Sequence, residues 1–429
     1  MLAPSEYRLQ ECENVRNLLR DTLRYAYFSK SSKDVYAECL DRLQLIENAF
    51  NILEEDNEDI LEEMSNQLSD LSELIGRVER SRIEEFSWPF ALALQNLALR
   101  ICTKGQPGGD PAPRFFISAD DELNSYQIIT EQNAAGFISS PLFNIIFPRS
   151  LKNFVLLHPI LGHELGHAAI SAPQHSRLLS DEVLTPLAHK SPLQDLTRFQ
   201  SWLDKIDADL DIDEQTKAVS AWQEELYCDI FGLLLMGPSY VGASTSLLRP
   251  FKTRAASDSH PPSVTRFWII NKVITALGWR EQLRKHKQLR SATDRYFDSL
   301  SKLAANVPRK YRLLNETQIL AAMERLQSFL ADISGALCPM PDLVQVAAMR
   351  RRMLAGCPPV ASEVTRSLKI SNSNVDFRSV LFAGWITWMS EERPATDLTF
   401  IKLNMLCQRG ILQQNAVDVW KTHERKQGP

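Results

Sequence analysis

The spacing of apolar residues predicts helices over the first part of the chain. From residue 6 to about residue 103, apolar positions recur every three or four residues, which is the period of an amphipathic α-helix. The clearest series is Leu61, Met64, Leu68, Leu71, Ile75 and Val78. It spans about two and a half heptads, fewer than the three or four of a free coiled coil, so we expect it to pack in a helical hairpin of the same chain.

A region of shorter period follows a stretch rich in glycine and proline at residues 104–113, which predicts a loop or a domain boundary. Alternation of apolar and polar positions predicts short β-strands over residues 114–118, 126–130 and 144–147. From about residue 151 helical spacing returns and continues to the end of the chain. The predicted fold class is therefore mainly α with a small β-sheet.

Composition places the chain among globular proteins and limits its partners. Of 429 residues, 44% are hydrophobic and 24% are charged, close to the averages for soluble domains. Lysine and arginine number 48 against 53 acidic residues, so no positive field attracts nucleic acid or anionic lipid. No apolar run reaches the roughly 18 to 20 residues of a membrane span. We therefore expect a soluble protein that does not bind nucleic acid.

Seven cysteines are scattered along the chain without a CxxC pair, unlike a disulfide framework or a cysteine zinc knuckle. The N-terminal residues carry charges from residue 6 onward and lack the apolar centre of a signal peptide. These features predict a reducing, cytoplasmic location. Cys228 is expected to be a small buried core residue.

His163, Glu164 and His167 form the pattern HExxH. On a helix, the two histidines lie one turn apart on the same face, so both imidazoles can reach one tetrahedral metal ion, with Glu164 beside the metal-bound water. Gly162 and Gly166, four residues apart, allow another backbone to approach this helix closely. The motif therefore predicts a metal site next to a close helix crossing.

The helix that carries this motif is apolar, which makes its polar side chains informative. Burying two imidazoles and a carboxylate without partners costs on the order of several kcal/mol, and a bound cation removes this cost. The alternative is a pair of core histidines with a salt-linked glutamate. Pro159 lacks the N–H group that an interior helical turn needs, so we expect the helix to start or kink there.

A hydrolytic zinc site has three protein ligands and one open position, so a third ligand must come from elsewhere. No histidine completes the extended motif HExxHxxGxxH. Downstream, Glu225 and Asp229 are four residues apart on an otherwise apolar helix. One carboxylate can bind the metal while the other accepts the free N–H of a ligating histidine. Glu225 is preferred because it has the paired acid one turn on; Glu224 is the rival ligand, and two solvent-facing acids are the alternative.

The HELGH segment, followed by the ExxxD helix and by an HPP element at residues 260–262, resembles the gluzincin metallopeptidases, in particular their CAAX-prenyl-protease/HtpX-type branch. The likeness extends over residues 158–278. It implies a zincin-like fold in which His163, His167 and Glu225 bind Zn²⁺.

The same resemblance implies roles for the residues around the metal. Glu164 is the expected general base, Asp229 supports a ligating histidine, and His260 and Arg266 contact the substrate or the oxyanion. Independently, Pro261 suits the first turn of a helix, which leaves His260 at its N-terminal edge, where the helix dipole favours a neutral imidazole. Members of that branch are embedded in membranes and this sequence predicts no span, so a preference for prenylated or membrane substrates does not carry over.

These observations predict a zinc-dependent peptidase that hydrolyses peptide bonds of protein substrates. Its zincin-like catalytic core is expected at residues 105–280, between helical regions at residues 1–104 and 281–429 that shape or gate the cleft and offer a surface to a regulatory protein. The strand at residues 144–147 is expected to pair with an extended peptide by strand addition. Two alternatives stay open: a zincin-fold binding or scaffold protein without turnover, and a zinc hydrolase of a non-peptide amide.

Overall fold

Most of the chain is described by the computed structural model, namely residues 4–25, 27, 30–52, 58–82, 88–106, 111–120, 126–130, 140–170, 212–249, 260–305, 307, 312, 314–359 and 376–426. Within these residues the protein is mainly α-helical, with one three-stranded mixed sheet. The predicted fold class is confirmed in these two respects. The chain packs as two compact units, residues 1–152 and 153–429. The zincin-like core and the expected three-region organisation stay predictions.

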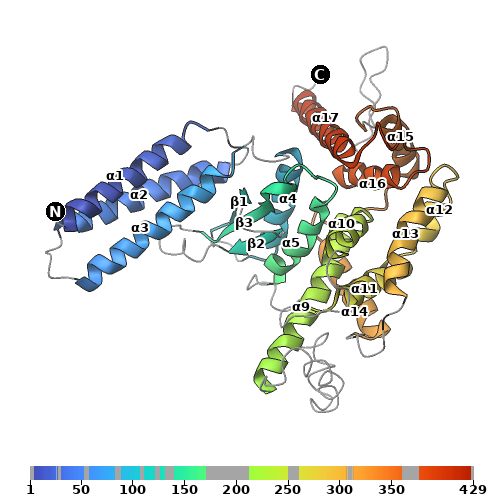
Figure 1. The fold of residues 1–429 in the computed structure, drawn as a ribbon, viewed down its shortest axis with the longest axis horizontal. Coiled ribbons are helices and arrows are strands. Elements are labelled where there is room, and N and C mark those ends of the chain that lie inside the picture. Colours follow the sequence, from blue (N-terminus) through green and yellow to red (C-terminus); the bar gives the residue numbers. More distant parts are fainter. Residues whose placement is uncertain are drawn as a thin grey trace. The chain divides into compact units, whose positions relative to one another are not determined.

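Three long helices of the first unit lie side by side (Figure 1). They are α1 (Pro4–Thr22), α2 (Lys30–Ile52) and α3 (Glu58–Glu79). Their facing apolar side chains form a buried cluster. The apolar series of α3 faces this cluster, with these members buried or partly buried: Leu61, Met64, Leu68, Leu71, Ile75 and Val78. The predicted packing within the same chain is therefore confirmed, and a third helix joins the expected hairpin.

Helix α4 (Trp88–Thr103) packs against the sheet of the same unit. The strands are β1 (Arg114–Asp120), β2 (Gln127–Thr130) and β3 (Leu142–Pro148), followed by the short 3-10 turn η3 (Arg149–Leu151). They coincide with the three predicted strands and extend two of them. Residues 107–110 of the predicted loop lie outside the described residues.

The central position of β3 corrects one expectation. β3 pairs with β1 in parallel and with β2 in antiparallel orientation, so backbone groups on both of its sides are engaged. All of its residues are buried. The prediction that this strand pairs with an extended peptide is therefore wrong, because strand addition requires an open sheet edge. A continuous run of buried apolar residues is itself typical of a central strand.

The second unit is built around the long helix α9 (Ile212–Met236). The helices that pack against it include α5 (Leu161–Ile170), α11 (Ser263–Ala276) and α14 (Glu316–Ala331). Residues 225–244 are all buried, as expected for a helix that is apolar on every side. Any charged side chain in this stretch must therefore find its partners inside the protein.

Several shorter elements complete the second unit. They are η4 (His158–Ile160), α10 (Ser239–Leu248), α12 (Trp279–Arg284), α13 (Arg290–Ala304), α15 (Leu343–Leu354), α16 (Phe377–Trp388) and the longer α17 (Phe400–Lys426). Because η4 leads directly into α5, the expected start of that helix near Pro159 is confirmed. Helix α11 begins at Ser263, slightly later than the start predicted from Pro261. In the described part of the chain, no helix is both long and apolar enough to cross a membrane.

The C-terminal end of α9 is fixed by a buried arginine of α16. Arg378 donates a hydrogen bond to the carbonyl oxygen of Leu235 at 2.6 Å, and the N–H of Cys338 donates to the carbonyl oxygen of Leu234 at 2.9 Å. The last carbonyl groups of a helix have no partner within the helix. These bonds satisfy two of them and hold the end of α9 in one position.

Candidate metal centre

Helices α5 and α9 cross at close range because glycines line both sides of the contact. A Cβ atom on Gly166 would lie 3.1 Å from Cα of Cys228, and one on Gly162 would lie 3.2 Å from Cα of Gly232. The close backbone approach predicted from Gly162 and Gly166 is therefore confirmed, and Cys228 is buried as expected. Gly232 is the matching glycine of α9 and was not expected. An isolated glycine inside a helix is the signal that could have revealed it.

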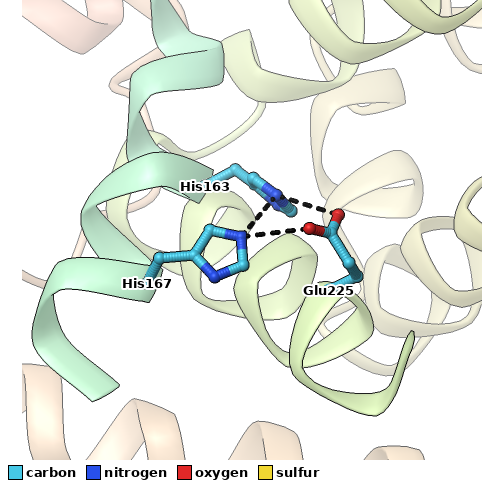
Figure 2. A group of neighbouring side chains, drawn as sticks. All are labelled: His163, His167 and Glu225. Carbon is cyan, nitrogen blue, oxygen red and sulfur yellow. Dashed lines mark hydrogen bonds and ion pairs between the residues drawn. The ribbon is translucent and has the colours of Figure 1, made fainter. Parts of the chain in front are cut away.

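This crossing brings the two histidines of α5 against one carboxylate of α9 (Figure 2). Nε2 of His163 lies 3.2 Å from Nε2 of His167 and 3.2 Å from Oε2 of Glu225. Nε2 of His167 lies 3.2 Å from Oε1 of Glu225. A tetrahedral zinc ion with bonds of about 2.0–2.1 Å places its donor atoms roughly 3.3–3.4 Å apart. The two nitrogens therefore have the spacing that such an ion requires, and each has a different oxygen of the Glu225 carboxylate at a similar distance.

The outer nitrogen of each histidine, Nδ1, contacts a carboxylate of its own. Nδ1 of His163 lies 3.1 Å from Oδ1 of Asp229, and Nδ1 of His167 lies 2.7 Å from Oε1 of Glu224. An imidazole that donates from Nδ1 presents a lone pair at Nε2, the form that binds metals. Two such lone pairs 3.2 Å apart, next to the Glu225 carboxylate, repel one another unless a cation lies between them. The residues present therefore fit a metal ion.

Glu224 thus has a different place from the one considered in the sequence. The group that could hold a metal consists of His163, His167 and Glu225, whereas Glu224 contacts His167 from outside this group. Its role as a partner of the second histidine was missed. The signal was its position directly before Glu225, because adjacent helical residues point about 100° apart and can contact different atoms of one neighbour.

A buried arginine of α11 neutralises the acids of α9. The guanidinium of Arg266 binds Asp229 through two nitrogens, Nε at 2.7 Å and Nη2 at 2.8 Å, and its Nη1 lies 3.3 Å from Oε2 of Glu225. Burial raises the pKa of Asp229, but Arg266 and His163 outweigh burial and hold it well below its usual range. Burial likewise raises the pKa of Glu225, and the two histidines reverse this effect. Both acids are therefore ionised.

The surroundings of His163 and His167 raise the pKa of both imidazoles. Burial lowers the pKa of His163, but its hydrogen bonds to Asp229 and Glu225 outweigh burial and raise it. Burial also lowers the pKa of His167, and its thiol and carboxylate neighbours again outweigh burial. These contacts therefore favour positive charge at the site, which protons or a metal cation can supply.

The remaining residues singled out in the sequence lie close to this group. Glu164 follows His163 on α5 and is half-buried. His260 is 59% exposed, and its Nε2 lies 3.5 Å from Oε1 of Glu225. Burial lowers the pKa of His260, so the neutral form is favoured. Arg266 is buried and contacts both acids, and its Nη2 also lies 3.2 Å from Nδ1 and 3.4 Å from Nε2 of His163; contact with a substrate or an oxyanion stays a prediction.

Comparisons with protein-family models, with curated proteins and with solved structures found no match. The functional assignment therefore depends on the motif residues and on the geometry of the site.

Proposed function

We propose that the protein is a zinc-dependent peptidase of the gluzincin type with a zincin-like core, in which His163, His167 and Glu225 hold the ion. The observation that carries this proposal is the convergence of two imidazole nitrogens and one carboxylate: the nitrogens are 3.2 Å apart, and each lies 3.2 Å from a different oxygen of Glu225. The carboxylates on the outer nitrogens support it, because they give both imidazoles the tautomer of a metal ligand.

The number of donors favours catalysis over a structural role. Structural zinc sites are closed by four protein ligands, whereas catalytic sites have three and keep one position for water or substrate. Among the residues that the structure describes, the group has three members, and two histidines with a glutamate are a ligand set of hydrolytic zinc sites. This ligand set is the one that the gluzincin resemblance implies.

The residues of the site then have distinct roles in peptide hydrolysis. Bound to His163, His167 and Glu225, zinc would supply a water of lowered pKa and would polarise the scissile carbonyl group. Glu164 accepts the proton of the attacking water and passes it to the leaving amine. Burial raises the pKa of Glu164, and the two neighbouring histidines only partly offset this effect. His260, exposed beside Glu225, is the donor that we assign to the oxyanion.

Substitution of the general base separates catalysis from metal binding. Glu164→Gln keeps the size of the side chain but removes the proton acceptor, so we expect stoichiometric zinc and a loss of cleavage of about a hundred- to ten-thousandfold. Elemental analysis gives the zinc content, and N-terminal profiling of cell extract incubated with each protein gives the cleavage. Glu316→Gln is the matched control, because Glu316 forms a surface ion pair with Lys272; it should cleave like wild type.

The same experiment separates the proposal from its alternatives. If wild type holds zinc but wild type and Glu164→Gln treat every protein substrate alike, the peptidase proposal fails and a binding or scaffold role is favoured. If small amides alone are cleaved, and Glu164 is needed, the protein is a non-peptide hydrolase. His163→Ala removes one of the three donors and should lose the ion itself; full zinc content in that variant would contradict the assigned site.

A further inference from the structure

We propose that Tyr240 is a positioning residue of the metal centre: it holds the Asp229 carboxylate, and Asp229 in turn orients His163. This inference rests on the proposed metal site but not on peptidase activity. Tyr240 belongs to α10, which follows α9 after a tight turn, and nothing in the sequence motifs pointed to it.

The contacts of Asp229 support this role. The hydroxyl of Tyr240 donates to Oδ1 of Asp229 at 2.7 Å. The same oxygen lies 3.1 Å from Nδ1 of His163 and accepts from Nη2 of Arg266 at 2.8 Å, so three donors converge on one atom. Oδ2 accepts from Nε of Arg266. Tyr240 and Arg266 thus fix the orientation of the carboxylate, and the direction of its bond to His163 depends on both of them.

The chain is built to bring this tyrosine onto Asp229. Gly237 has a φ of +64°, which glycine adopts without strain, and this turn folds α10 back onto α9. Gly232 leaves room for the aromatic ring, since a Cβ atom there would lie 2.8 Å from Cε2 of Tyr240. Tyr240 itself is fully buried. A buried hydroxyl requires a partner, and the partner here is the acid that contacts a metal ligand.

A second buried tyrosine offers a matched comparison. The hydroxyl of Tyr296 donates to the carbonyl oxygen of Pro238 at 2.6 Å and accepts from the N–H of Gly242 at 2.7 Å. Both partners belong to the same turn and helix as Tyr240. Tyr296 therefore stabilises this segment through a buried hydrogen bond, as Tyr240 does, but its bonds are to the backbone and not to an acid of the site.

The test compares Tyr240→Phe with Tyr296→Phe in the full-length protein. Each variant loses one buried hydroxyl, so both should have a lower melting temperature. Only Tyr240→Phe should weaken Zn²⁺ binding, by about tenfold, the lower end of the range for residues that support a metal ligand. Affinity is measured by competition with a chelator, and the visible spectrum of the Co²⁺-loaded protein should change in the same variant alone. Equal affinities and equal spectra in the two variants would overturn the inference.

A second measurement keeps the inference testable if Tyr240→Phe does not fold. Site-specific meta-fluorotyrosine at position 240 retains the hydroxyl, and its ¹⁹F resonance should shift when Zn²⁺ is added, whereas the same label at position 296 should not respond. An unchanged resonance at position 240 would refute the coupling. Wild type that binds zinc without cleaving proteins leaves this inference intact and removes the proposed activity, whereas wild type that binds no zinc removes both.

Discussion

Replacing Gly232 by alanine tests whether the close crossing of α5 and α9 sets the metal centre. A Cβ atom at this position would lie 2.8 Å from the backbone nitrogen of His163 and 2.8 Å from Cε2 of Tyr240. Ordinary contact begins at 3.4 Å, and a close-packed interior offers no free volume, so one neighbour must move by about 0.6 Å. His163 is a proposed ligand, and metal–ligand distances tolerate only about 0.2 Å.

The expected change in the free energy of unfolding of Gly232→Ala follows from two opposing effects. Alanine favours a helix over glycine by about 1 kcal/mol, whereas overpacking of a core costs about 1–3 kcal/mol. The nearest atoms in Gly232→Ala are a backbone nitrogen and a buried ring, which cannot swing aside, so the upper part of that range applies. We expect the free energy of unfolding to fall by about 2 kcal/mol. Zinc affinity should fall at least tenfold, about 1.4 kcal/mol.

Gly76→Ala provides the matched control, because Gly76 also lies within a helix, α3. A Cβ atom there would meet only Nη1 of Arg80, at 3.8 Å, which is ordinary contact. This variant should gain about 0.5–1 kcal/mol and bind zinc like wild type. Thermal unfolding and chelator competition measure both properties for each protein. If Gly232→Ala were stabilised like Gly76→Ala and bound zinc like wild type, the argument from the helix crossing would be refuted.

Two further predictions concern protons and thiols. The raised pKa values of His163 and His167 mean that protonated imidazoles stabilise the ion-free fold below about pH 6.5, a contribution lost as pH rises through the raised values. Zinc must displace these protons when it binds. Calorimetry in buffers of different ionisation enthalpy should therefore show proton release, and zinc affinity should be higher at about pH 8 than at about pH 6. Zinc binding with neither effect would contradict the ligand assignment. Burial raises the pKa of the Cys228 thiol to about 12, whereas Cys357 is exposed. After maleimide treatment of the folded protein, mass mapping should therefore find Cys357 modified and Cys228 intact. Early modification of Cys228 would show that the crossing of α5 and α9 opens.

The buried acids explain why the site needs partners on several helices. Asp229 and Glu225 lie in a stretch of α9 that is buried on every side, where an unpaired charge is costly. Arg266 of α11 binds both acids, and the histidines of α5 contact them as well. Removing one partner from such a network leaves a buried charge without compensation, which typically costs about 3–5 kcal/mol.

Local features of the fold could be predicted from the sequence because they depend on residues close together in the chain. The helical period identified α3 and the apolar face by which α3 packs into the buried cluster of the first unit. The four-residue spacing of His163 and His167 placed both imidazoles on one face of α5. Gly162 and Gly166 predicted that another backbone lies close to that face, although not which one.

The choice between Glu224 and Glu225 shows where local reasoning ends. The two residues are adjacent on α9 and point about 100° apart, so the rotation of the helix about its own axis decides which one faces the histidines. That rotation is set by the contact of Gly232 and Cys228 of α9 with the glycines of α5. The pairing of Glu225 with Asp229 favoured the residue that lies against both histidines but did not place Glu224 on His167.

The sequence by itself determined the helices, the approximate strand positions and the side chains able to bind a metal, since helical and strand periods and motif spacing are local properties. Only the tertiary structure decided the central place of β3, the engagement of Arg266 with the acids, and the approach of Tyr240 to Asp229. These depend on contacts between segments far apart in the chain. The sequence pattern of each segment is compatible with many partners, and the requirement to pack apolar faces and pair buried charges selects one arrangement.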